Sequence, residues 1–185
     1  QNKKENRSDN FFDEQDERQE YDLEDILKLD DKILIVADSG LGKTTLLQEV
    51  FLRMAERWHA GHPVPFLFTP SAAQFLNESQ YQNVLYNRLF QSGVTLRESQ
   101  LRKLVTDLVS ERRTIYLIDA LDQMQTADSV AEYFMLEQRC PGLCTSRPET
   151  AARLDANFAQ AKKLELLPFT REAIETYYGD WLQSS

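Results

Sequence analysis

The sequence has little cysteine, no long apolar run and no excess of positive charge, and each shortage argues against a class of protein. Two cysteines in 185 residues make no disulfide framework of the kind that stabilises small secreted domains. No apolar run approaches the roughly 18 residues needed to cross a bilayer, and no signal peptide precedes the fold, so we expect a cytoplasmic protein. The formal net charge of −9 argues against binding to nucleic acid or to an anionic membrane by bulk electrostatics.

The two cysteines leave two interpretations open. Cys140 and Cys144 can be combined with His59 and His62 into a zinc set, but Cys-x-x-x-Cys beside a Pro-Gly turn matches structural zinc spacing loosely. The alternative is that Cys144 is a small buried apolar residue, and we favour it.

A change in composition divides the chain near residue 20. Residues 1–20 are almost free of aliphatic side chains and dense in charged and amide side chains. Such a segment cannot bury enough apolar surface to offset the entropy lost on ordering. We therefore expect residues 1–20 to be an acidic disordered tail or linker and residues 21–185 to be one domain. Because the chain begins with Gln, we expect it to be a fragment of a larger protein.

The apolar pattern from residue 21 onward alternates between strand and helix periods. Five short runs have strand character, at residues 32–36, 64–68, 114–119, 142–146 and 163–167. Helical spacing is found at residues 23–29, 45–58, 71–92 with a break, 98–108, 130–138 and from 170 onward. This order predicts an α/β fold with a mainly parallel five-stranded sheet and helices on both faces. Pro65, within residues 64–68, and Pro63, just before them, predict an edge strand or a strand start, whereas residues 114–119 fit a central strand.

A short polar turn between the first strand and the next helix predicts a phosphate-binding loop. Its residues are Ala37-Asp38-Ser39-Gly40-Leu41-Gly42-Lys43-Thr44-Thr45. Glycines allow successive N–H groups to point at an anion, and the following helix adds its positive end. Lys43 can reach the β- and γ-phosphates, and the Thr44 hydroxyl can take one position on Mg²⁺. The alternative is an ordinary tight turn with an exposed lysine. Ala37 stands where such loops usually begin with Gly.

Polar residues after two later strands can complete this site. Asp119 ends a buried strand, where ligands of open α/β sheets gather, and is the candidate metal carboxylate. Of Asp122 and Gln123, only Asp122 can act as a base, although an amide can hold a water by hydrogen bonding. Arg147 follows another strand end and can direct its guanidinium at a γ-phosphate. The alternatives are a solvated aspartate and, for Arg147, a surface ion pair with Glu149.

Taken together, four motifs are more specific than any one of them. They lie at residues 33–47, 115–123, 144–148 and 164–170, and with them the stretch from about residue 23 to 182 resembles the NACHT group of signal-transducing STAND P-loop ATPases, relatives of AAA+ modules. The small Ala120 between Asp119 and Asp122 is typical of the group. The resemblance implies a three-layer P-loop NTPase sandwich that binds ATP or ADP with Mg²⁺.

The resemblance also assigns roles. It implies that the loop holds nucleotide, that Asp119 serves Mg²⁺ and that Arg147 senses the γ-phosphate. The family frequently has Asp-Glu where this chain has Asp122-Gln123, and an amide cannot accept a proton from water, so slow hydrolysis is expected. Members act as switches in which ADP holds a closed state and exchange to ATP permits oligomerisation. Self-association of the longer protein is therefore expected, without membrane or nucleic-acid partners.

Two other functions remain open at this stage. Ala37 and Gln123 are compatible with a module that binds nucleotide without significant hydrolysis. A small-molecule P-loop kinase is the third possibility, although the sequence has no arginine-rich lid and no legible acceptor site. The preference for ATP over GTP rests on the resemblance alone.

Overall fold

The structure of this protein is a computed structural model that describes residues 20–28, 31–70, 78–137, 141–168 and 170–171. The predicted acidic tail therefore lies outside the described residues except for Glu20. The predicted last helix lies outside the described residues from residue 172 onward. Cys140 also lies outside the described residues. No helix of the described residues is both long and apolar enough to cross a bilayer.

Five strands form one sheet in the order β2-β3-β4-β1-β5, and every pair is parallel. The strands are β1 (Lys32–Val36), β2 (Val64–Phe68), β3 (Thr114–Ile118), β4 (Gly142–Ser146) and β5 (Lys162–Glu165). The predicted parallel five-stranded α/β fold is thereby confirmed. The proline-bearing strand β2 is an edge strand, and β3 has a neighbour on each side, as the sequence indicated.

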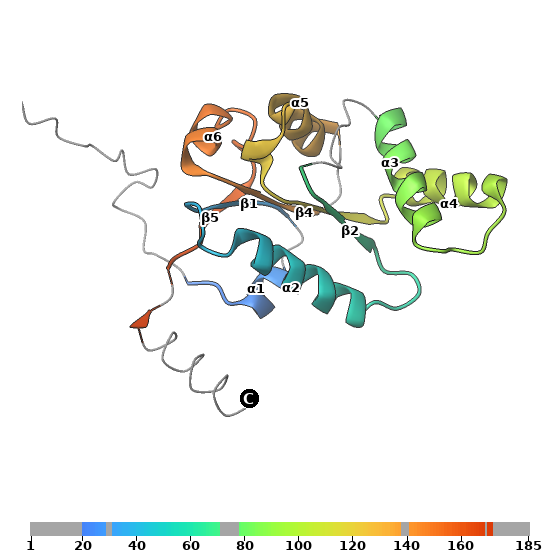
Figure 1. Cartoon of the computed structure of the whole chain (residues 1–185), viewed down its shortest axis with the longest axis horizontal. Helices are drawn as coiled ribbons and strands as arrows, with labels where there is room; N and C mark the ends of the chain where they lie inside the picture. The colour runs from blue at the N-terminus through green and yellow to red at the C-terminus, as the bar shows by residue number, and fades with distance from the viewer. Residues whose placement is uncertain (1–19, 29–30, 71–77, 138–140, 169, 172–185) are drawn as a thin grey trace, which may run out of the picture.

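Helices cover both faces of this sheet (Figure 1). One face carries α1 (Leu23–Leu27) and α2 (Lys43–Glu56). The other carries α3 (Glu78–Gln91), α4 (Glu98–Ser110), the 3₁₀ turn η1 (Leu121–Gln123), α5 (Ala127–Glu132), the π-helical η2 (Tyr133–Glu137) and α6 (Pro148–Arg153). The result is the three-layer arrangement that the alternating pattern predicted.

Alternation along the strands sends side chains into two separate cores. In β1, Leu34 and Val36 join the core under α3 to α6, whereas Ile33 and Ile35 join the core under α1 and α2. Burial on both faces explains why these strands read as continuous apolar runs and not as alternating ones. The first core is aromatic, since Tyr81, Tyr116 and Phe68 pack there with ring centroids 4.9–6.3 Å apart.

Some boundaries differ from the sequence expectation for local reasons. Helix α2 begins at Lys43, two residues before the predicted start, because Gly42 takes a left-handed conformation as its N-cap. Strand β5 is shifted by one residue at its start and two at its end. Helix α5 begins at Ala127 and its continuation is π-helical. Helix α6 was not predicted, because six residues give too little periodicity, although Pro148 at its first turn is a helix-start signal.

The connections after β1 and β4 diverge and form a topological switch point at the carboxyl ends of these strands. The two strands are neighbours, yet β1 leads to α2 on one face and β4 leads to α6 on the other. In open α/β sheets, ligands bind at such a switch point. The loop at residues 37–45 and Arg147 both follow the strands that form it.

Candidate nucleotide-binding site

The loop at residues 37–45 needs glycine for its backbone conformation. Gly40 and Gly42 have φ angles of 85° and 89°, which residues other than glycine rarely adopt. A Cβ at either position would have no heavy atom within 4 Å, so neighbouring atoms do not crowd the loop. The two glycines therefore set the path of the chain and leave room for a ligand to approach the backbone.

Alanine at position 37 fits this loop without strain. Ala37 is buried, and its N–H donates to the carbonyl of Ser146 at 3.1 Å, which ties the loop to the end of β4. The φ angle of Ala37 is not positive, so alanine is not strained there. The position where related loops begin with glycine therefore does not require glycine in this chain.

The start of α2 is open to an anion. Its N-cap, Gly42, has no side chain to accept from the first turn, and that turn contains no acidic residue. The first N–H groups of a helix have no partner within the helix, and they carry its positive end. The N-terminus of this 14-residue helix is therefore suited to binding a phosphate group.

Lys43 folds its side chain over the loop. Its ammonium donates to the carbonyl oxygens of Ala37 at 2.6 Å and Asp38 at 2.7 Å. The lysine is thus held at the loop. The alternative of an ordinary tight turn predicts instead that this side chain extends into solvent. A phosphate oxygen can replace either carbonyl as the acceptor, because an anion is a stronger partner for an ammonium.

Asp119 lies at the end of β3 and is bonded from two sides. It is 5% exposed, and the Thr44 hydroxyl donates to its Oδ2 at 2.8 Å. The Thr145 hydroxyl donates to its Oδ1 at 3.0 Å. A buried carboxylate beside a threonine hydroxyl is a set of hard oxygen atoms of the kind that suits Mg²⁺. The structure therefore brings together the two residues predicted as metal ligands, Thr44 and Asp119.

Thr145 is a site residue that the sequence analysis did not single out. Its fully buried hydroxyl donates to Asp119 and accepts from the N–H of Ala120 at 2.9 Å. That second bond holds Ala120, whose φ of 49° and ψ of 57° place it in the left-handed region. A threonine at the end of an otherwise apolar strand was the signal that was available for it.

Asp122 and Arg147 form an ion pair beside this group. The Arg147 Nε lies 3.0 Å from Asp122 Oδ2, and the side chains are 46% and 6% exposed. The other oxygen, Oδ1, is buried and has no hydrogen-bond partner among the described residues. The partner of Arg147 is thus Asp122 and not Glu149. Gln123, the next residue of η1, is exposed.

Cys144 lies in β4 and is buried, as we favoured from the sequence. Burial, together with the negative charges of Asp119 and Asp122, raises the pKa of its thiol well above the usual range. The residue therefore stays protonated and packs as a small apolar side chain.

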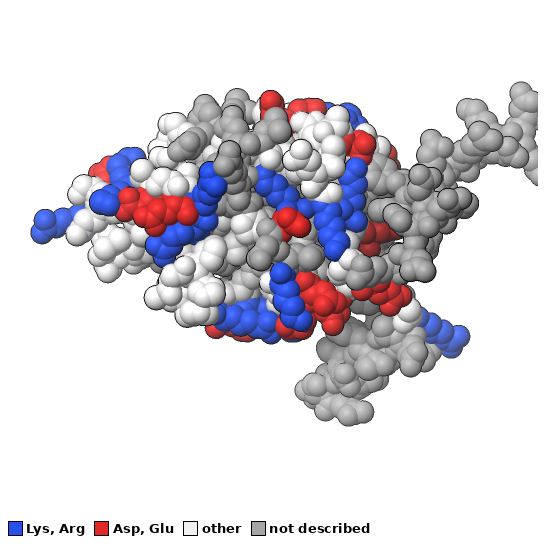
Figure 2. All heavy atoms as spheres, turned by 180° about the vertical axis from the view of Figure 1, so that it is seen from behind, with Lys and Arg blue, Asp and Glu red and all other residues white. Residues whose placement is uncertain are grey.

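The surface charge of the described residues is mixed. Figure 2 shows basic and acidic side chains lying close to one another on the face opposite to that of Figure 1. Among the described residues, ion pairs one helical turn apart include Arg102–Glu98 and Lys103–Asp107 on α4. Opposite charges therefore compensate each other within these pairs.

The parallel sheet, the glycine loop and the carboxylate after β3 define a P-loop NTPase fold. Residues 31–185 match the NACHT domain family, and the chain belongs to that family. Fold and family together indicate nucleotide binding. No curated protein matches the chain in a sequence search.

Solved structures share the fold at low identity. The ORC1 protein of Aeropyrum pernix, determined in complex with DNA, is 17% identical with a TM-score of 0.51, covering 81% of this chain and 44% of that one. A signal transduction ATPase with numerous domains (STAND) from Pyrococcus horikoshii, which has a tetratricopeptide repeat sensor, is 16% identical with a TM-score of 0.50, covering 88% of this chain and 25% of that one. The chain thus spans less than half of either protein.

Proposed function

We propose that this NACHT domain binds ATP or ADP with Mg²⁺ at residues 37–45 and hydrolyses ATP slowly, so that the bound nucleotide controls self-association of a longer protein. The observation that carries the proposal is the 2.8 Å hydrogen bond from Thr44 to Asp119. It joins the first residues of α2 to the end of β3 at the point where a phosphate-bound cation is needed.

Each site residue has a role that its contacts support. Lys43 would transfer its ammonium from the loop carbonyls to phosphate oxygens, and the loop N–H groups would orient the phosphates. Thr44 and Asp119 would hold Mg²⁺, directly or through water. The chemistry that Mg²⁺ supplies when bound is neutralisation of charge on the phosphate oxygens. Thr145 would keep Asp119 in position from the opposite side.

Slow hydrolysis follows from the residues near the γ-phosphate position. Asp122 is the candidate base, and Arg147 must first leave one of its oxygens before that oxygen can accept a proton. Gln123 is exposed and cannot accept a proton from water, although its amide can orient one. Slow turnover suits a switch, because the nucleotide then reports a state that persists.

The same contacts favour a second candidate, a module that holds nucleotide without significant hydrolysis. Single-turnover release of phosphate from ATP separates the two. We expect the wild-type rate to exceed that of Asp119→Ala by at least about tenfold. Equal rates would favour the second candidate, and transfer of phosphate to an added metabolite would favour a kinase. A cooperative urea unfolding transition of Asp119→Ala serves as the control that the variant is folded.

Residues 21–185 would form the nucleotide-binding domain and residues 1–20 a linker to a preceding domain. Self-association is proposed for the longer protein. It is tested by sedimentation of that protein with ATP and with ADP, and an equal mass in both nucleotides would count against the switch.

A further inference from the structure

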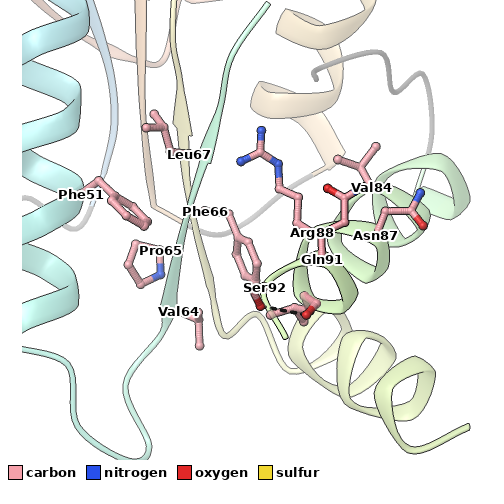
Figure 3. A pocket seen from close by; sticks show the side chains of 11 residues that line it. Phe51, Val64, Pro65, Phe66, Leu67, Val84, Asn87, Arg88, Gln91 and Ser92 are labelled. Atoms are coloured by element: carbon pink, nitrogen blue, oxygen red, sulfur yellow. Dashed lines mark hydrogen bonds between the residues drawn. The ribbon is translucent and has the colours of Figure 1, made fainter. Parts of the chain in front are cut away.

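A large hollow lies along the outer edge of β2, away from the phosphate-binding loop. Its volume is about 840 Å³. Phe51 of α2 and Pro65 lie on one side of the strand, and Phe66 and Val84 lie on the other, with Val84 coming from α3 (Figure 3). The hollow therefore surrounds the strand edge itself and has apolar walls from both helical layers.

The backbone of β2 presents polar groups to this hollow. The N–H of Val64 donates to Arg113 at 2.8 Å, and the carbonyl of Phe68 accepts from Asp119 at 2.8 Å, so these residues face β3. Alternation then turns the backbone groups of Pro65 and Leu67 outward. Proline has no N–H, which leaves one outward donor, that of Leu67, and two outward carbonyls. An edge of this kind can pair with a short added strand but not with a long one.

A cation lies inside the same hollow. The guanidinium carbon of Arg88 is 5.5 Å from the ring centroid of Phe68, and the side chain is half-buried. Among the described residues, no carboxylate lies within ion-pairing distance of it. Partial burial lowers the pKa of Arg88, which reflects the cost of removing this charge from water. The hollow is thus complementary to a segment with apolar and acidic side chains.

This chain contains one such segment near its start. In residues 1–19 the only large apolar side chains are those of Phe11 and Phe12, and Asp13 and Glu14 follow them directly. Asp22, at the N-cap of α1, is eight residues beyond Glu14, and eight extended residues span up to about 26 Å.

The start of α1 is bonded to α2, the helix that also supplies Phe51 to the hollow. Glu24 of α1 is bonded to Arg53 at 3.1 Å and to Arg57 at 2.7 Å, both on α2. Phe51, on the same helix, lines the hollow. A helix with its side chains is about 10–12 Å across, so the length of chain before Asp22 is enough to pass around α2.

We propose that residues 11–14 of this chain add to the outer edge of β2 as a short extended strand, with a phenylalanine ring in the hollow and a carboxylate on Arg88. Pairing with the Leu67 N–H and carbonyl would supply the backbone contacts. The docking would hold the segment before residue 21 against α2 and β2. It is independent of nucleotide binding.

Amide exchange in the full chain tests the proposal. We expect the Leu67 N–H to exchange at least about tenfold more slowly in the wild type than in the Phe11→Ser/Phe12→Ser double variant. Those substitutions lie outside every contact described for the domain, so loss of folding does not confound them. An equal exchange rate in the two proteins would overturn the proposal.

Charge reversal supplies the second arm. Arg88→Glu should abolish the protection, and adding Asp13→Arg and Glu14→Arg should restore it. Arg153→Glu on α6, the same change outside the hollow, should leave it intact. Failure of the reversed pair to restore protection in a folded protein would contradict the proposed contact. Protection that rises with protein concentration would show that a second copy occupies the edge, which would also overturn it.

Discussion

Two buried carboxylates three residues apart are satisfied in opposite ways. Asp119 is 5% exposed, and both its oxygens accept from threonine hydroxyls, at 2.8 and 3.0 Å. The Asp122 side chain is 6% exposed, and it has a guanidinium on one oxygen and no described partner on the other. The first region is bonded by neutral donors, whereas the second is bonded by a permanent charge.

The difference indicates what each region can exchange. A hydroxyl group can rotate so that its oxygen coordinates a cation. Mg²⁺ can therefore bind in the Asp119 region without displacing a charged side chain. The Arg147 side chain is half-exposed and has one ion-pair partner among the described residues, so it can leave Asp122 for an anion. Under the proposed function, the first region would receive a cation and the second would release one toward a phosphate.

Lys43→Ala should have the largest effect, because it removes the ammonium group that already lies at the loop. Charge-assisted hydrogen bonds are worth about 1.5–3 kcal/mol, so nucleotide affinity should fall by about 100-fold. Isothermal titration with Mg²⁺ and ADP measures this. Unchanged affinity in a folded Lys43→Ala protein would remove the basis for both nucleotide-binding functions.

Ala120 lies in the chain between Asp119 and Asp122, and its left-handed conformation limits which residues can replace it. Ala120→Val should lower the free energy of unfolding by about 2 kcal/mol, because a β-branched side chain is strained at a φ of 49°. Ala120→Gly should stay within about 1 kcal/mol of wild type, since glycine tolerates that conformation but loses a buried methyl group. Urea denaturation checks both. Equal losses would show that packing and not conformation sets this position.

Arg147→Ala should destabilise the protein by about 1–2 kcal/mol in the absence of nucleotide, because it leaves a buried charge without a described partner. Asp122→Asn should cost less, since an amide needs no counter-charge. Urea midpoints of the two variants measure the difference. A larger loss for Asp122→Asn would mean that the carboxylate has another stabilising contact.

A smaller, pH-dependent effect is expected at α1, remote from both carboxylates. The guanidiniums of Arg57 and Arg53 lower the pKa of Glu24 to about 2, from an ordinary value of 4.5. The stability from this contact is therefore complete above about pH 4.5 and is lost as the pH falls toward 2. The stability difference between wild type and Glu24→Gln should shrink over that range. A difference that is constant with pH would contradict the ion-pair assignment.

The sequence predicted what depends on local pattern. The five strands were visible because burial on both faces makes them continuous apolar runs, and the loop was visible because its glycines and Lys43 are contiguous. The edge position of β2 followed from Pro65, because a proline has no N–H to donate within an inner ladder.

Contacts across the sheet could not be predicted in the same way. Thr145 reaches Asp119 only because β3 and β4 are neighbours, and 26 residues separate the two in the chain. The pairing of Arg147 with Asp122 also needs the position of η1 under α6. Helix α6 and the place of Arg88 on Phe68 likewise depend on packing that no short pattern records.

The most direct test is the coupling energy between Asp122 and Arg147, measured by a double-mutant cycle of unfolding with no nucleotide, with saturating ADP and with a non-hydrolysable ATP analogue, each nucleotide with Mg²⁺. We expect a clear coupling without nucleotide and with ADP, and its loss with the ATP analogue, because Arg147 would then contact the γ-phosphate. An equal coupling in all three states would contradict it.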